Sequence, residues 1–107
     1  MKLKVKKEYK QFSNPLRGEK SIEVSIIIKN LEQFNVKNVL IVDKIPLKYR
    51  IHDFNFSNLS EYNITAKIKQ REILIEIPEI KKNEQLVINY YCIGTGDFKR
   101  EKPYVLF

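Results

Sequence analysis

Apolar and polar residues alternate with a period of two along most of this sequence, and this alternation limits the fold more than any other feature. From residue 22 to residue 28, Ile, Val, Ile and Ile occupy every second position. Successive side chains of a β-strand point to opposite faces, so the pattern predicts strands with one buried face. No stretch of eleven or more residues has apolar positions at helical spacing, as an amphipathic helix requires. The sequence therefore predicts an all-β chain.

The spacing of the alternating segments predicts how the strands are organised. The unbroken apolar run Val39–Val42 indicates a central strand covered on both faces. Pro46 and Pro78 are expected to end strands, because proline cannot donate a ladder hydrogen bond. We expect an immunoglobulin-like β-sandwich of about seven to eight antiparallel strands, at roughly ten-residue spacing, in one domain over residues 1–107. The expected strands centre on residues 3–5, 22–28, 39–42, 49–56, 64–68, 73–77, 86–92 and 104–107.

The chain is basic, with a formal net charge of +7, and five of its lysines lie in the first ten residues. Such a charge can attract nucleic acid, anionic lipid or an acidic protein surface. We favour a simpler interpretation, in which lysines protect an edge strand from pairing with other chains. In the alternative interpretation, a basic β-barrel binds single-stranded nucleic acid through Lys2–Lys10 and the aromatic residues of Phe54–Tyr62.

The sequence lacks the residue sets that catalytic and metal sites need. Cys92 is the only cysteine and His52 the only histidine, so neither an intrachain disulfide nor a usual zinc site can form. No base is available for a hydrolytic triad other than His52, which lies in an expected strand. Gly94–Asp97 is better explained as a hairpin turn than as a phosphate loop, because no helix follows it. We predict no enzyme activity, no cofactor and no metal.

Localisation is weakly constrained. No apolar run approaches the roughly 20 residues of a membrane helix, so we expect no membrane insertion. The first ten residues lack the apolar core of a signal peptide, which predicts a cytoplasmic protein or a piece of a longer exported one. Two sequons, beginning at Asn58 and Asn63, support export weakly and lie at or beside a predicted loop. A bias toward Lys, Glu and Ile is typical of heat-adapted, including archaeal, proteomes, although an AT-rich genome produces the same bias.

One candidate interaction patch emerges from the alternation. If the even-numbered side chains of the segment 49–56 face solvent, they form an amphipathic surface of basic and aromatic residues. Such a surface can contact a protein partner or stack on bases. In the competing interpretation, the same aromatic residues close one end of the core. The candidate patch consists of Arg50, His52, Phe54, Phe56 and Tyr62.

Two segments resemble a repeat family of unknown function found in surface proteins of archaea and bacteria. The segments are Val24–Asn30 and Val36–Pro46, and Asn30, Asp43 and Pro46 match the family's Asn, Asp and Pro positions. The resemblance covers residues 20–93. It implies an immunoglobulin-like stalk, spacer or adhesive unit of a cell-surface or appendage assembly, with a protein as its partner.

The three matched residues are expected to have local structural roles rather than functional ones. Asn30 tolerates a left-handed turn, Asp43 can accept backbone hydrogen bonds at the strand end, and Pro46 fixes the direction in which the chain leaves the strand.

Overall fold

The described part of the chain forms eight β-strands, which are divided between two sheets. The computed structural model describes residues 2–14, 18–56, 63–98 and 101–106. Within these ranges no helix has the length and apolarity needed to cross a bilayer. The strands are β1 (Leu3–Asn14), β2 (Glu19–Asn30), β3 (Val36–Lys44), β4 (Tyr49–Phe56), β5 (Thr65–Lys69), β6 (Glu72–Ile80), β7 (Gln85–Gly94) and β8 (Tyr104–Leu106).

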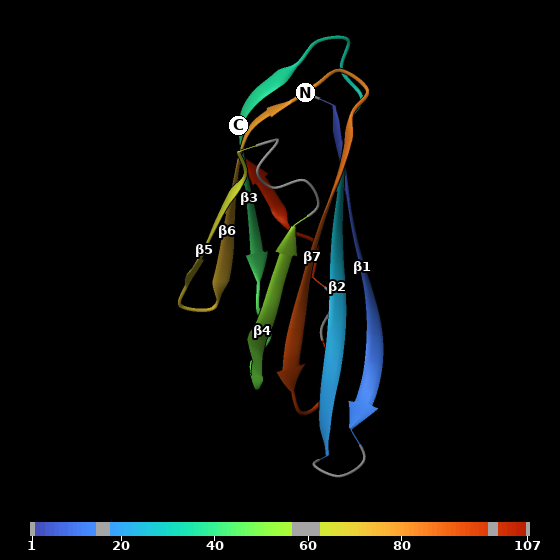
Figure 1. The fold of residues 1–107 in the computed structure, drawn as a ribbon, viewed down its shortest axis with the longest axis vertical. Helices are drawn as coiled ribbons and strands as arrows, with labels where there is room; N and C mark the ends of the chain where they lie inside the picture. Colours follow the sequence, from blue (N-terminus) through green and yellow to red (C-terminus); the bar gives the residue numbers. More distant parts are fainter. Residues whose placement is uncertain (1, 15–17, 57–62, 99–100, 107) are drawn as a thin grey trace.

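The strands form two four-stranded antiparallel sheets that pack face to face (Figure 1). The first sheet has the order β1-β2-β7-β4 and the second the order β5-β6-β3-β8. Most connections therefore pass from one sheet to the other, and only β1-β2 and β5-β6 are hairpins of sequence neighbours. The prediction of an all-β, immunoglobulin-like sandwich of seven to eight antiparallel strands is confirmed.

The alternating residues supply the core between the sheets. Across the first sheet, Ile22 pairs with Cys92, Val24 with Tyr90 and Ile26 with Ile88, and all of these side chains are buried. The second sheet contributes an equivalent layer, made of residues 0–2% exposed: Val39, Ile41, Ile73, Ile75 and Ile77. Full burial of one such side chain stabilises the fold by roughly 1.5–3 kcal/mol, so this layer is the main source of stability.

Proline 78 does not end its strand, contrary to the sequence prediction. β6 continues through Pro78 to Ile80. Pro78 lies beyond Glu76, the last residue of β6 that pairs with β5. On the other side it lies opposite Asn38, whose φ of 56° interrupts the pairing of β3. Proline is tolerated here because neither neighbouring strand requires its missing N–H.

The positions of β1 and β3 agree with their sequence patterns. β1 is an edge strand, paired only with β2, as its lysines indicated. β3 lies between β6 and β8, which confirms the predicted central position. The expected cover on both faces is not found, because no other described strand packs on the outward side of β3, where Val42 is 9% exposed and Leu40 partly exposed. Pro46 follows the end of β3 at Lys44.

Candidate functional site

Only part of the predicted interaction patch lies within the described residues. Arg50 is exposed, with Nη2 3.9 Å from Glu19 Oε2. His52 is exposed at an irregularity in the pairing of β4 with β7. The backbone of β4 pairs Phe54 with the buried Tyr90 and Phe56 with the buried Ile88, and the side chains of Phe54 and Phe56 lie outside the described part. Tyr62 and Asn58 also lie outside the described residues, so the patch stays a prediction.

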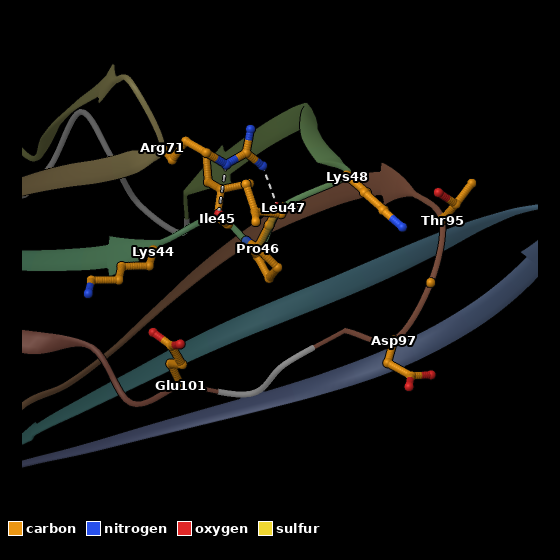
Figure 2. A pocket seen from close by; sticks show the side chains of 10 residues that line it. Lys44, Ile45, Pro46, Leu47, Lys48, Arg71, Thr95, Asp97 and Glu101 are labelled. Carbon is orange, nitrogen blue, oxygen red and sulfur yellow. Dashed lines mark hydrogen bonds between the residues drawn. The ribbon is translucent and has the colours of Figure 1, made fainter.

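A surface pocket of about 530 Å³ lies where β3 leaves the second sheet (Figure 2). It is organised by Arg71, which lies in the β5-β6 turn. The guanidinium donates from Nε to the carbonyl oxygen of Ile45 at 3.2 Å, and from Nη2 to the carbonyl oxygens of Pro46 and of Tyr49, the latter at 2.7 Å. Arg71 therefore fixes the loop of residues 45–48, which we call the pocket loop.

The pocket loop presents one strongly exposed apolar side chain among charges. Leu47 is 76% exposed. The pocket is lined by basic groups on one side and by Asp97 and Glu101 on the other. The basic groups are Lys44, Lys48 and Arg71. Such a mixture suits a polar and apolar contact with another molecule better than the binding of a single ion.

Apolar side chains continue from the pocket onto the solvent-facing side of the second sheet. Because Ile41 points into the core, its neighbours Leu40 and Val42 point outward. The register places Leu106 beside Leu40, and both Tyr104 and Leu74 beside Val42. We call these five residues, Leu40, Val42, Leu74, Tyr104 and Leu106, the outer strip.

The two β8 residues of the outer strip are accessible, and the strip lies beside the pocket. Tyr104 is 56% exposed and Leu106 is 53% exposed. Lys44, which lines the pocket, places its Nζ 5.5 Å from the centre of the Tyr104 ring. Lys44 thus connects the apolar outer strip with the charged lining of the pocket.

Asn30, one of the residues matched to the surface-protein family, stabilises a turn through its side chain. Its Nδ2 donates to the carbonyl oxygens of Phe34 and Ile80 at 3.0 Å and of Lys81 at 3.2 Å. Its Oδ1 accepts from the Glu32 N–H at 2.8 Å. The side chain is fully buried, and its φ is not among the positive ones. Asn30 therefore acts by hydrogen bonding and not by adopting a left-handed conformation.

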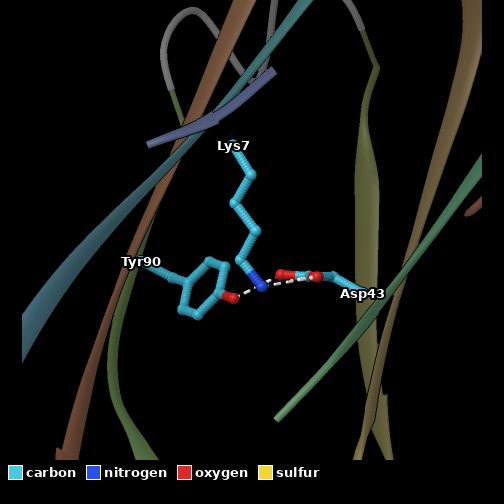
Figure 3. Close-up of polar contacts among 3 residues, drawn as sticks. All are labelled: Lys7, Asp43 and Tyr90. Atoms are coloured by element: carbon cyan, nitrogen blue, oxygen red, sulfur yellow. Dashed lines mark hydrogen bonds and ion pairs between the residues drawn. The ribbon is translucent and has the colours of Figure 1, made fainter. Parts of the chain in front are cut away.

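Asp43 has a different role from the expected one. It points into the core rather than toward the backbone at the strand end (Figure 3). Its Oδ1 lies 2.8 Å from Lys7 Nζ, and its Oδ2 accepts a hydrogen bond from the Tyr90 hydroxyl. The side chains of Lys7 and Asp43 are 2% and 1% exposed. These three residues, which we call the buried cluster, connect β1, β3 and β7 across the sandwich.

Aromatic rings close the buried cluster from solvent. Phe98 is buried, and the centre of its ring lies 5.7 Å from Lys7 Nζ. Tyr49 meets Phe98 edge to face at 5.3 Å and donates its hydroxyl proton to the Gly96 carbonyl oxygen at 2.8 Å. Tyr9 contacts the same ring at 5.5 Å.

Burial controls the ionisation of the groups near the cluster. It raises the pKa of the Tyr90 hydroxyl far above its ordinary value, and the neighbouring Asp43 carboxylate adds to the effect. Burial also raises the pKa of the Cys92 thiol to about 12. Both groups therefore keep their protons at neutral pH, which makes Cys92 an unreactive core residue.

Two features of the sequence could have revealed the buried cluster. Lys7 has the same parity as Leu3, Val5 and Tyr9, and Asp43 the same parity as the core residue Ile41. A charged residue at an inward position on two different strands is the signal of a buried pair. Lys7 is consequently unavailable to the nucleic-acid contact set Lys2–Lys10, and the two separate sheets are not a barrel.

Comparison with known proteins shows the fold alone. No protein-family model matches the sequence, and no curated protein matches it. Among solved structures, the chain is similar to the chitin-binding domain of Chi18aC from Streptomyces coelicolor, with a TM-score of 0.57 and 8% sequence identity. The similarity covers 94% of this chain and 89% of that domain.

Proposed function

We propose that this chain is a noncatalytic module that binds another protein through the outer strip and the adjoining pocket. The observation that carries the proposal is the apolar outer strip on the water-facing side of a sheet. The outward side of such a sheet normally carries polar residues. An apolar centre with a charged surround is instead the composition of a protein-binding surface. Leu106 and Tyr104 supply its most accessible contact area.

The buried cluster supports a noncatalytic role. Its ionisable groups interact with one another inside the sandwich, where the Phe98 ring separates them from solvent. Arg71 in the pocket is committed to three backbone carbonyl oxygens of residues 45–49. These groups stabilise the architecture, whereas reaction with a substrate would require them to be accessible to it.

We place the module in a cell-surface or appendage assembly. The support is the resemblance of residues 20–93 to the surface-protein repeat family. Asn30 organises the turn after β2 and Pro46 the pocket loop, so two of the matched residues stabilise the loops that flank β3. A stalk or spacer unit needs well-defined loops of this kind to fix its contacts with neighbouring units.

The protein-binding proposal is tested with a phage-displayed library of random peptides, selected on the immobilised full chain. Such a selection enriches peptides for the surface that binds most readily. The affinity of the enriched peptides is then measured for Leu106→Glu and for Phe34→Glu, a matched control. Leu106 and Phe34 are both 53% exposed, but Phe34 lies in the turn before β3.

We expect Leu106→Glu to weaken peptide binding by about tenfold or more, because a charge replaces a central apolar contact. Phe34→Glu should leave binding unchanged. Binding that is lost with Phe34→Glu and kept with Leu106→Glu would contradict the proposal.

A second candidate function is polysaccharide binding. It is favoured by the similarity to a chitin-binding domain and by the outward surface of the first sheet. The outward side of the first sheet carries Phe12, which is 45% exposed, and the partly exposed Tyr91. On the same side, next to Tyr91 and away from Phe12, Ser25 donates its hydroxyl to Asn89 Oδ1 at 2.7 Å. Aromatic faces and hydrogen-bonding side chains together suit the apolar faces and hydroxyl groups of sugar rings.

Co-sedimentation with insoluble chitin separates the two functions. If the chain binds polysaccharide, it pellets with chitin, and Phe12→Ala with Tyr91→Ala abolishes pelleting while Leu106→Glu does not. If the chain stays in the supernatant, chitin is excluded as its ligand and the peptide selection decides the protein-binding proposal.

A further inference from the structure

The contact between Lys7 and Asp43 is unusual because both groups are almost completely removed from water. Their N–O distance is 2.8 Å, and the exposed fractions of their side chains are 2% and 1%. Desolvating two opposite charges takes up most of the free energy that their attraction provides, unless further hydrogen bonds complete the site. The Lys7 ammonium, which has three N–H groups to donate, gives one of them to Asp43 Oδ1.

The short contact in this dry site allows a proton to pass directly between the two groups. Proton transfer from Nζ to the carboxylate produces an amine next to a carboxylic acid, held in contact by two rigid strands. Such enforced proximity can accelerate, by many orders of magnitude, a reaction that is slow in water. The amine is a nucleophile in this form, and the carboxyl carbon is the electrophile beside it.

We propose that Lys7 and Asp43 condense to an amide (isopeptide) bond inside the folded chain. The lone pair of Nζ attacks Asp43 Cγ and forms the N–C bond. One Cγ–O bond then breaks, and its oxygen leaves as water with the two protons that the ammonium gives up. The amide nitrogen keeps one hydrogen, so the reaction consumes one ammonium and one carboxylate and needs neither an oxidant nor a co-reactant.

Tyr90 is the catalytic residue of this condensation. Its hydroxyl already donates a hydrogen bond to Asp43 Oδ2, the oxygen opposite the one that contacts Lys7. Burial keeps this hydroxyl protonated. It can therefore give a proton to the departing oxygen and recover one from the attacking nitrogen. The Phe98 ring, 5.7 Å from Nζ, excludes water that would otherwise favour the reverse reaction.

The bond would join the edge strand β1 to β3 of the other sheet, between residues 36 positions apart. Among the strands, only β2 pairs with β1 in the first sheet. A covalent connection would therefore prevent β1 from detaching when the chain is pulled or heated. The reaction occurs once within each molecule, which is consistent with a noncatalytic module.

The intact mass of the denatured chain, residues 1–107, tests the proposal. We expect the wild-type protein, purified in its folded form, to be lighter than its sequence by the mass of one water molecule. Proteolysis should release one linked peptide pair that contains Lys7 and Asp43. The Lys7→Met variant should have its full sequence mass. The matched control Lys6→Met removes an exposed lysine 3.9 Å from Glu8 Oε1 and should still lack one water.

The Tyr90→Phe variant tests the role of the hydroxyl. We expect the lighter form to appear about 100-fold more slowly than in the wild type after refolding, as is typical for the loss of a general acid. The proposal is overturned if folded wild-type protein retains its full sequence mass after prolonged incubation. It is also overturned if the missing water maps to residues other than Lys7 and Asp43. Both measurements use the wild type, so they decide the question even if Lys7→Met fails to fold.

Discussion

Single buried polar residues stabilise this fold at points where the backbone could not otherwise satisfy its own hydrogen bonds. Asn30 is the clearest case, because its amide donates to carbonyl oxygens from two different turns. It thereby connects the turn after β2 with the turn after β6. Asp43 has a comparable role between the sheets, where its carboxylate pairs with the Lys7 ammonium and accepts a hydrogen bond from the Tyr90 hydroxyl.

Replacing Asn30 with Ala should reduce the free energy of unfolding by about 3 kcal/mol, because buried carbonyl groups lose their donors. The measurement is urea denaturation followed by circular dichroism. Asn35→Ala is the control, since Asn35 accepts a single exposed hydrogen bond from the Lys82 N–H at 2.9 Å. The control should lose less than about 1 kcal/mol. Equal losses in the two variants would show that the turn does not depend on the Asn30 side chain.

The buried Cys92 thiol predicts a loss of stability at alkaline pH. Its pKa is raised from about 9.0 to about 12 in the folded chain. Between these values the unfolded chain loses a proton that the folded chain keeps, so stability is complete below pH 9 and falls as pH rises. The slope for one such group is about 1.4 kcal/mol per pH unit.

Urea denaturation of the wild type and of Cys92→Ala, from pH 8 to pH 11, checks this prediction. Tyr90 and Tyr49 also have raised pKa values, so both proteins should lose stability at the upper end. The wild type should lose it more steeply from pH 9 onward. Parallel stability curves would mean that Cys92 is not protected from ionisation in the folded chain.

At the scale of the strands, the sequence contains enough information to find each element but not its neighbours. The eight expected segments correspond to the eight strands, because alternation and turn residues act locally. The pairing of β8 with β3, and of β4 with β7, depends on contacts between distant residues. Pro78 shows the same limit, since its tolerance depends on Asn38 in the facing strand.

The candidate site was less predictable for the same reason. Leu40 and Val42 are visible in the sequence as an apolar run, but Leu74 and the residues of β8 join them only through the register of the second sheet. The buried cluster likewise requires the parity of three strands at once. The predicted patch of Arg50, His52, Phe54, Phe56 and Tyr62 rests on the alternation of one strand and on one residue of the following segment, and alternation in one strand does not decide which of its sides faces water.

The edge position of β1 predicts a role for its outward lysines. We expect replacement of Lys4, Lys6 and Lys10 by Thr to speed aggregation, because the uncharged edge can pair with other chains. Light scattering at constant protein concentration and temperature measures the rate. The control replaces Lys29, Lys81 and Lys82 by Thr, which gives the same formal charge of +4 (7 − 3). If both variants aggregate equally, then net charge and not the edge position protects the chain.

In the whole molecule, the residues that stabilise the fold and the surface proposed to bind a partner lie in different places. It is elongated, with extents of 49 × 22 × 22 Å, and its isoleucine-rich interior holds the buried cluster. The outer strip lies on the opposite side of the second sheet from that interior, and the pocket lies where the pocket loop meets residues 95–97, which follow β7 of the first sheet. This arrangement allows the surface to vary in sequence without loss of the core, as the proposed binding function requires.

Mapping the bound surface by NMR tests this account most directly. The ¹⁵N-labelled full-length chain is titrated with the peptide enriched in the phage selection, and the amide shifts are followed. We predict that the largest shifts fall on residues 40–48 and 104–106, which carry the outer strip and the pocket loop. Shifts confined to the first sheet, around Phe12 and Tyr91, would contradict the assignment of binding to the second sheet.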